Sequence, residues 1–165
     1  MRRVLALLLS VASLLVVSGG IAVAELQSLR GHGDITRMTA DNGANAVTAR
    51  VFGIGRPCTV GKDLSVFVET RRSRILYQAQ GVCSAGTQWS TTLYYTATGD
   101  IQDVTRVRCS NFEFVRSNAT SSFRIVIPRR CLDNAPSSIR VEAQGSNWGS
   151  VTGGTAGPTG VLARG

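Results

Sequence analysis

The sequence has few of the residues on which most enzymes and metal sites depend. It contains one histidine, His32, and four cysteines, and no two cysteines have the C-x-x-C spacing of a zinc site. No G-x-S-x-G nucleophile elbow is present, and the stretch at residues 53–58 lacks the final glycine of a dinucleotide-binding fingerprint. A sustained helical period is also missing. These absences point away from zinc, dinucleotide and α-helical proteins, and we expect no cofactor.

The first 24 residues have the build of a secretory signal peptide. Arg2 and Arg3 give a positive start, residues 4–17 form an apolar run, and residues 22–24 are a small-residue cleavage signature. The alternative is an uncleaved membrane anchor, but the apolar run is shorter than the roughly 20 residues that span a bilayer. We therefore expect residues 1–24 to be removed, and the mature chain to be secreted without a transmembrane span.

Arginine dominates the charge of the chain. Eighteen basic residues exceed ten acidic ones, the formal net charge is +8 at pH 7, and Lys62 is the only lysine. Removal of the signal peptide takes away two arginines and leaves +6. A positive surface favours anionic partners. For an exported bacterial protein these are envelope polymers or lipid head groups rather than nucleic acid.

All four cysteines lie in the expected mature chain and predict disulfides. An even number of cysteines is typical of a disulfide-bonded exported domain, and four cysteines allow three pairings. We favour Cys58–Cys83 with Cys109–Cys131, because sequential pairing closes two short loops between neighbouring strands. Each bridge is expected to stabilise the fold by about 3 kcal/mol.

Period-two alternation of apolar residues predicts an all-β fold. The clearest case is the stretch at residues 121–132, where Phe123, Ile125 and Ile127 share one face and Pro128 ends the strand. About nine such runs occur, roughly ten residues apart, with turn signals between them. This spacing is typical of an antiparallel β-sandwich of the immunoglobulin-like or jelly-roll-like kind.

Composition also predicts the limits of the domain. Residues 25–33 are expected to be a flexible lead-in, residues 34–144 the sandwich, and residues 145–165 a loose tail rich in glycine, serine and threonine. Within the sandwich, residues 81–86 are expected to form a loop that holds Cys83.

Three stretches carry a resemblance to a known group of proteins. They are residues 33–36, residues 46–51, and residues 127–132 (IPRRCL) followed by residues 138–141 (SIRV). The sequence resembles small secreted actinobacterial proteins that have a signal peptide, a β-rich domain and a P-R-x-C-L step before an x-R-V strand. The resemblance covers most of the mature chain in short pieces. It implies origin and fold and assigns no catalytic or binding residue. In outline the sequence also resembles carbohydrate-binding sandwiches.

The candidate catalytic and metal-binding residues have simpler interpretations. His32 lies between two glycines near the expected mature N-terminus, and a general base would need a nucleophile and an orienting partner beside it. Asp100 and Asp103 flank a turn and would supply two of the six to eight oxygen ligands of calcium. We favour a solvated histidine and ordinary turn aspartates, and assign no catalytic residue and no metal ligand.

Aromatic and arginine side chains are the candidates for ligand binding. Trp148 lies in a polar stretch, and Tyr94 lies on the polar side of its strand if Tyr95 faces the core. Such rings stack on sugars, although Trp89 and Trp148 are alternatively expected to cap the core. Arginines pair with anionic groups on a ligand. The arginine candidates are Arg71, Arg72, Arg74, Arg129 and Arg130, and Arg106 and Arg108 share one strand face.

We expect a secreted, non-enzymatic binding module whose partner is an anionic envelope glycan or a secreted protein. Two alternatives stay open. A secreted protease inhibitor would present Arg56-Pro57-Cys58 or Arg129-Arg130 to a trypsin-like pocket. An unrecognised hydrolase would depend on His32.

Overall fold

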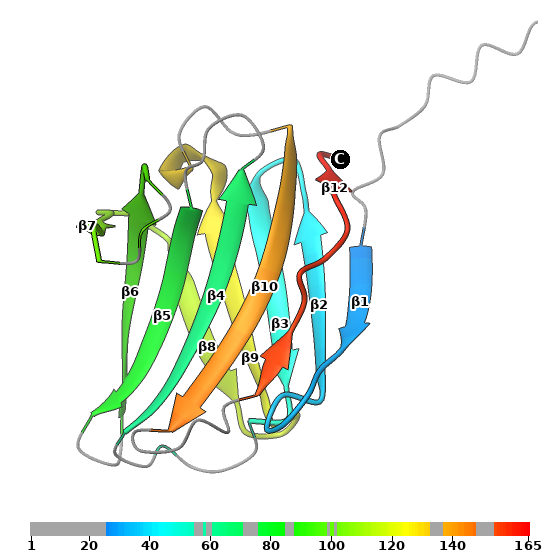
Figure 1. The fold of residues 1–165 in the computed structure, drawn as a ribbon, viewed down its shortest axis with the longest axis vertical. Helices are drawn as coiled ribbons and strands as arrows, with labels where there is room; N and C mark the ends of the chain where they lie inside the picture. The colour runs from blue at the N-terminus through cyan, green and yellow to red at the C-terminus, as the bar shows by residue number, and fades with distance from the viewer. Residues whose placement is uncertain are drawn as a thin grey trace, which may run out of the picture.

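Two antiparallel sheets packed face to face make up the described part of the chain (Figure 1). The computed structural model describes residues 26–54, 58, 61–70, 76–84, 88–98, 100, 102–132, 137–147 and 154–165. These residues form twelve strands and one short 3-10 helix, η1 (Arg129–Cys131). The all-β sandwich predicted from the alternation of apolar residues is therefore confirmed.

The five-stranded sheet has the order β1-β2-β3-β9-β8. Its strands are β1 (Leu26–Arg30), β2 (Arg37–Asn42), β3 (Ala46–Phe52), β8 (Glu113–Ser117) and β9 (Ser122–Pro128). In the β3–β9 pair, Val47 lies opposite Ile127 and Val51 lies opposite Phe123. Directly opposed residues lie on the same face of a sheet, so this register gathers the apolar residues of both strands on one side.

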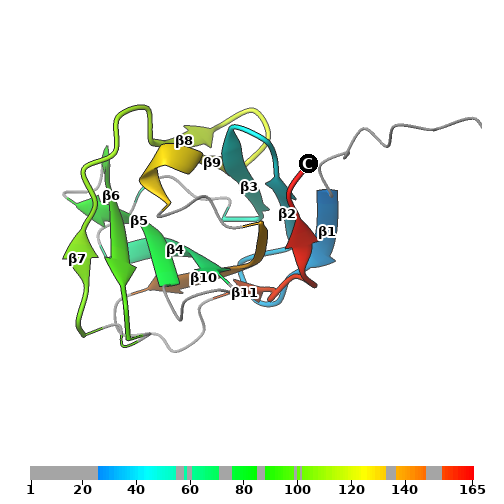
Figure 2. The ribbon, with the colours of Figure 1, turned by 90° about the horizontal axis from the view of Figure 1, so that it is seen from above.

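The second sheet has the order β11-β10-β4-β5-β6-β7, and β12 also pairs with β10. Its strands are β4 (Lys62–Thr70), β5 (Leu76–Ser84), β6 (Gln88–Thr96), β7 (Thr105–Arg106), β10 (Ser138–Asn147), β11 (Thr155–Ala156) and β12 (Leu162–Ala163). The long strands β4, β5 and β6 pair in sequence order. From β7 the chain then crosses one end of the sandwich to reach β8 in the other sheet (Figure 2).

Alternating residues of the facing strands fill the space between the sheets. In β9, Phe123, Ile125 and Ile127 are at most 1% exposed, whereas Arg124 between them is exposed. The side chains of a strand point alternately to its two faces. The alternation read from the sequence at residues 121–132 therefore identifies the core face of β9 correctly.

A cluster of three aromatic rings connects the sheets. The Phe123 ring meets Trp89 of β6 and Phe114 of β8 edge to face, with centroids 4.8 and 5.6 Å apart. Gly81 of β5 lies against the cluster, and a Cβ atom added there would be 2.5 Å from the Phe114 ring. Trp89 therefore packs against the core, as expected, and a side chain at position 81 would displace the Phe114 ring.

Both predicted disulfides are present. The Cα atoms of Cys58 and Cys83 are 5.4 Å apart, and those of Cys109 and Cys131 are 5.6 Å apart. The loop expected at residues 81–86 is wrong for residues 81–84, which belong to β5. Cys83 is paired there with Trp89 of β6. Gly81 and Cys83 can occupy this strand because the Phe114 ring covers Gly81 and the disulfide to Cys58 holds Cys83.

The N-terminal boundary predicted from composition is wrong. Residues 26–30, expected to be part of a flexible lead-in, form β1 and pair with β2 along their whole length. Leu26, Ser28 and Arg30 are exposed. Backbone pairing at the edge of the sheet holds this strand, together with Leu29, which is half-buried against the core. Backbone pairing leaves little trace in composition.

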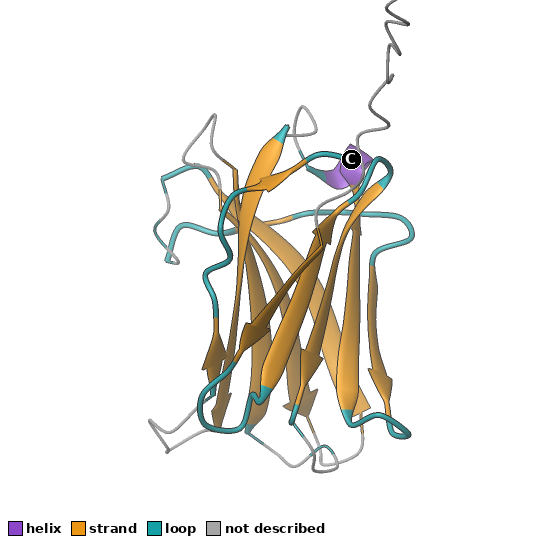
Figure 3. Ribbon diagram, turned by 90° about the vertical axis from the view of Figure 1, so that its right-hand side faces the viewer, coloured by secondary structure: helices purple, strands orange, loops and turns teal. Residues whose placement is uncertain are grey.

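The C-terminal boundary is also wrong. β10 continues to Asn147, and residues 154–165 pack against the sandwich with Ala156 and Leu162 buried. The backbone N–H of Thr159 donates to the carbonyl of Val141 at 2.9 Å, and its hydroxyl accepts from the N–H of Val141 at 3.0 Å. Figure 3 shows the described chain as strands and loops with the short helix η1. The chain ends beside β2, where the Gly165 N–H donates to the Asn42 carbonyl at 3.1 Å. Small polar residues suit this segment because backbone and hydroxyl hydrogen bonds attach it.

A matched pair of leucine variants tests whether the C-terminal segment belongs to the core. Leu162 is 0% exposed and Leu26 is 67% exposed. We expect Leu162→Ala to lower the free energy of unfolding by about 2–5 kcal/mol, because it leaves a cavity between β10 and β2. Leu26→Ala should change it by about 0.5 kcal/mol or less. Urea unfolding of the oxidised protein measures both, and equal small effects would contradict the packing of residues 154–165.

Candidate functional site

A groove of about 510 Å³ runs along the edge of β6 that faces away from β5. Thr91, Thr92 and Leu93 of β6 form one wall. Thr91 and Leu93 point to the core side of the sheet and Thr92 to the outer side, as the alternation along a strand requires. Because residues from both faces line it, the groove follows the strand's edge rather than one face. The facing wall consists of Arg106, Val107, Arg108, Cys109 and Phe112.

The groove opens where the pairing between β6 and β7 ends. β7 is two residues long and pairs with β6 only at Tyr94 and Tyr95. One further hydrogen bond joins the Val107 N–H to the Leu93 carbonyl at 2.8 Å. Beyond this bond the chain leaves β6 and crosses toward β8 (Figure 2). The two walls are therefore held together at three paired positions and separate beyond them.

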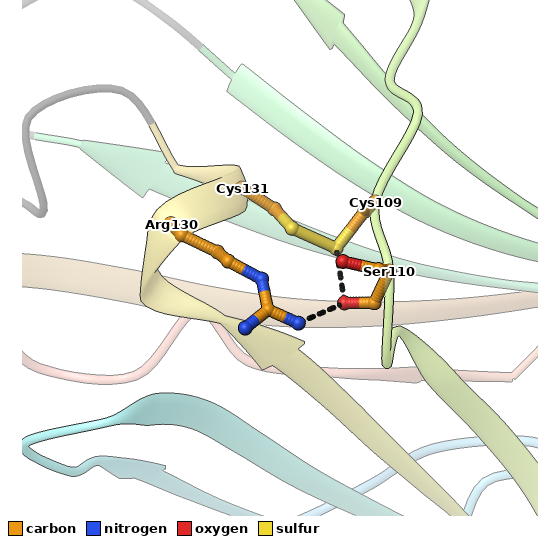
Figure 4. Close-up of a disulfide and its surroundings, with 4 residues drawn as sticks. All are labelled: Cys109, Ser110, Arg130 and Cys131. Carbon is orange, nitrogen blue, oxygen red and sulfur yellow. Dashed lines mark hydrogen bonds between the residues drawn. A yellow bond between two sulfur atoms is a disulfide. The ribbon is translucent and has the colours of Figure 1, made fainter.

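A disulfide and a hydrogen bond hold the second wall in place. Cys109 is bonded to Cys131, which ends η1 directly after β9. The Arg130 guanidinium donates to the Ser110 carbonyl at 2.7 Å (Figure 4). The chain then bends at Asn111, which has φ 63°, a left-handed conformation that asparagine tolerates. The disulfide and the Arg130–Ser110 hydrogen bond anchor the wall to the sandwich.

The second wall is positively charged. Arg106 and Arg108 are exposed, whereas Val107 and Cys109 are half-buried and pack against the core. This alternation agrees with the expectation that the two arginines share a face. Phe112 is also half-buried and adds a ring to the lining. None of the described lining residues carries a negative charge, so the groove is suited to anions.

Two of the other candidates for ligand binding lie next to the groove. Tyr94 is half-buried and pairs across the strands with Arg106, on the outer face of its sheet. Arg130 is exposed and contacts the wall through Ser110. Neither is part of the lining itself. The remaining sequence candidates, Arg71, Arg72, Arg74 and Trp148, lie outside the described residues.

Arg129 is not available to a ligand, which corrects the sequence prediction for this residue. It is 6% exposed, and its guanidinium donates to the carbonyls of Gly43 at 3.0 Å and Asn42 at 3.4 Å and to the Asn42 side-chain oxygen. Burial lowers the pKa of Arg129, and the charge of Arg164 lowers it further while that of Asp41 raises it. The first residue after Pro128 turns inward and only the second stays exposed, so the pair does not act as one basic site.

None of the described residues considered for protease inhibition or catalysis lines the groove. Arg56 and Pro57 lie outside the described residues, and Cys58 is buried in its disulfide. His32 has an exposed side chain, and its backbone pairs with Thr155 through bonds of 2.8 and 3.0 Å. The Asp100 carboxylate accepts from the Gln102 N–H at 2.9 Å, the usual arrangement of an aspartate turn. The described part of the chain contains no cluster of three or more histidine, cysteine or acidic residues placed to hold a metal ion.

The sequence did not single out Thr91, Thr92 or Phe112. Their alternation marks them only as strand residues, and threonine is common in strands. The local signal near the groove was the pair Arg106 and Arg108, which the sequence places on one strand face. The segment before the bend at Asn111 leaves β6 and is bonded through Cys109 to Cys131, 22 residues further along the chain. No local pattern in the sequence reveals this contact.

Comparisons of the chain with models of protein families, with curated proteins and with solved structures found no match. The resemblance to small secreted actinobacterial proteins therefore stays a prediction. Among the described residues, no helix has the length and apolar character needed to cross a membrane. The expected signal peptide at residues 1–24 lies outside the described residues.

Substitutions of the adjacent residues Arg129 and Arg130 test whether the buried Arg129 guanidinium stabilises the fold. Arg129→Met should lower the free energy of unfolding by about 1–3 kcal/mol, because the carbonyl of Gly43 and the oxygens of Asn42 lose their donor. Arg130→Met removes an exposed side chain and should cost about 0.5 kcal/mol. Urea unfolding of the two variants under oxidising conditions gives the comparison. Equal costs would show that Arg129 does not support the fold.

Proposed function

We propose that the protein is a secreted, non-enzymatic binding module that holds an anionic ligand in the groove beside β6. The observation that supports this most directly is the lining of the groove. Arg106 and Arg108 are exposed on one wall, and Thr91 and Thr92 belong to the other. A guanidinium binds carboxylate, phosphate or sulfate groups through several charge-assisted hydrogen bonds.

The size and lining of the groove suit a ligand that has both anionic and apolar parts. Its volume of about 510 Å³ lies within the usual range of ligand-binding clefts. Phe112 offers an apolar surface between the charged wall and the core. A ligand with anionic groups at intervals and an apolar or flat backbone fits this combination.

The chemistry of the lining supports binding rather than catalysis. General acid–base catalysis needs a group that exchanges a proton near neutral pH. Arginine stays charged at any physiological pH, and Cys109 is held in a disulfide. The remaining lining residues are threonine, leucine, valine and phenylalanine. Such a set can attract and orient an anion but has no group for moving a proton.

The two disulfides favour a location outside the cytoplasm, because such bonds persist in oxidising compartments. With the signal peptide expected at residues 1–24, they support export. The ligand is then an anion that occurs outside the cell membrane, such as an envelope polymer with carboxylate or phosphate groups or an acidic secreted protein. The net positive charge of the chain supports attraction to such partners.

Neutralising the two groove arginines tests the site. We expect Arg106→Gln with Arg108→Gln to weaken retention on immobilised polyglutamate and polygalacturonate by roughly tenfold or more at low salt, because charge-assisted hydrogen bonds are lost. Retention of the unaltered protein should fall as salt rises, since the Debye length shrinks from about 10 Å at 0.1 M to about 3 Å at 1 M. Elution across a salt series measures both.

The matched control removes the same charge elsewhere. Arg50 of β3 and Arg140 of β10 are exposed on strands that do not border the groove. The Arg50→Gln, Arg140→Gln variant should be retained nearly as well as the unaltered protein. If both double variants weaken equally, net charge rather than the groove is responsible and the proposed site is wrong.

The two disulfides allow a second comparison, because they close loops of similar length. Replacing either pair with serine should cost about 3 kcal/mol of stability. Only the Cys109→Ser, Cys131→Ser variant should also lose retention, because it frees a wall of the groove. The Cys58→Ser, Cys83→Ser variant should keep it. Retention is measured at a temperature at which circular dichroism shows both variants folded, and equal loss would speak against the anchored wall.

A further inference from the structure

We propose that the ligand of the groove is an extended acidic peptide segment of another protein, which adds to the edge of β6 as a further strand. This inference rests on the proposed function and names the class of ligand. It depends on the backbone of β6 as well as on the arginines, and the backbone is the part that distinguishes a peptide from other anions.

Among the described strands, the first half of β6 pairs with a neighbour on one side only. Residues 88–92 pair with β5, in a register that continues to Ser84 and Gln88 at the end of the strands. On the opposite side, β7 reaches only Tyr94 and Tyr95, and no other described strand pairs with β6. An unpaired strand edge presents N–H and C=O groups that can template another strand.

The direction of the backbone groups of β6 follows from the hydrogen bond between Val107 and Leu93, just beyond β7. Since the Leu93 carbonyl accepts from the Val107 N–H, the backbone groups of Leu93 point away from β5. In an antiparallel ladder this direction recurs every second residue, so the N–H and C=O groups of Thr91 and Trp89 point the same way. Thr91 lines the groove, and its backbone groups therefore face the space in which a ligand would lie.

The arginines have the spacing that an extended acidic peptide would match. Arg106 and Arg108 alternate with half-buried Val107 and Cys109, so they lie on one side of an extended segment, two residues apart. In any strand, side chains two residues apart are separated by about 7 Å. Glutamates or aspartates at every second position of an added strand would therefore recur at the same residue spacing as Arg106 and Arg108.

Charge also decides against a second copy of this chain at the same edge. Two β6 edges brought together would place Arg106 and Arg108 of both copies close to one another, and like charges at short range oppose association. An anionic glycan would satisfy the arginines, but it has no row of amide groups in register with β6. An acidic peptide supplies both the negative charges that the arginines attract and the backbone groups that the edge of β6 can bond, so it is the favoured ligand.

The test compares three probes of similar charge on the oxidised full-length protein. The first is a peptide of alternating threonine and glutamate, the second is the same peptide N-methylated at every residue, and the third is a polygalacturonate oligomer. We expect the first peptide to bind, and N-methylation to weaken binding by about tenfold or more, because several strand hydrogen bonds of modest net value are lost. The Arg106→Gln, Arg108→Gln variant should bind the first peptide much more weakly.

Amide hydrogen exchange gives a second measurement that does not depend on affinity. Binding of the first peptide should slow exchange at Thr91, whose N–H would join the new ladder, and polygalacturonate should leave this exchange unchanged. If both peptides bind within twofold of each other, if Thr91 exchange is unaffected, or if only the oligosaccharide binds, strand addition is wrong while anion binding stands. If none of the three probes binds, both proposals are wrong.

Discussion

The burial of Phe123 between the two sheets is the interaction on which the rest of the arrangement depends. Its ring meets Trp89 of β6 on one side and Phe114 of β8 on the other, and Gly81 leaves room for the cluster. Such aromatic contacts add to the burial of apolar area, which is the main stabilising term of the fold. Phe123 therefore fixes β9 relative to β6, the strand whose outer edge forms the groove.

The residues that follow β9 contact both the C-terminal segment and the wall of the groove. Arg129 turns inward to Asn42, whose side-chain N–H donates to the Leu162 carbonyl at 2.9 Å and whose own carbonyl accepts from the Gly165 N–H at 3.1 Å. Two residues later, Cys131 holds the groove wall through Cys109. Burying a guanidinium costs desolvation, and the hydrogen bonds to Asn42 and Gly43 offset that cost. One short helical turn thus connects the C-terminal segment and the candidate site to the same strand.

The groove is best understood as a sheet edge that is only partly covered. Exposed strand edges invite pairing with other chains, and charged residues near an edge oppose unwanted pairing. Arg106 and Arg108 stand beside the part of β6 that β7 leaves open. In the proposed function the same two charges would serve both purposes, because they repel another copy of this basic chain and attract an acidic ligand. Specificity would then come from repulsion as much as from attraction.

The sequence by itself determined the fold class, the core face of β9 and the presence of disulfides, and it favoured the pairing that the structure shows among three possible ones. These features carry local signals, namely period-two alternation at Phe123, Ile125 and Ile127 and an even set of cysteines between predicted strands. Only the tertiary structure decided that residues 26–30 and 154–165 belong to the sandwich, that Arg129 is buried while Arg130 is exposed, and that the segment after β7 leaves β6. Each of these depends on backbone pairing or on a contact with residues far away in the chain. Backbone hydrogen bonds are available to almost every residue type, so composition and periodicity do not reveal which segments will make them.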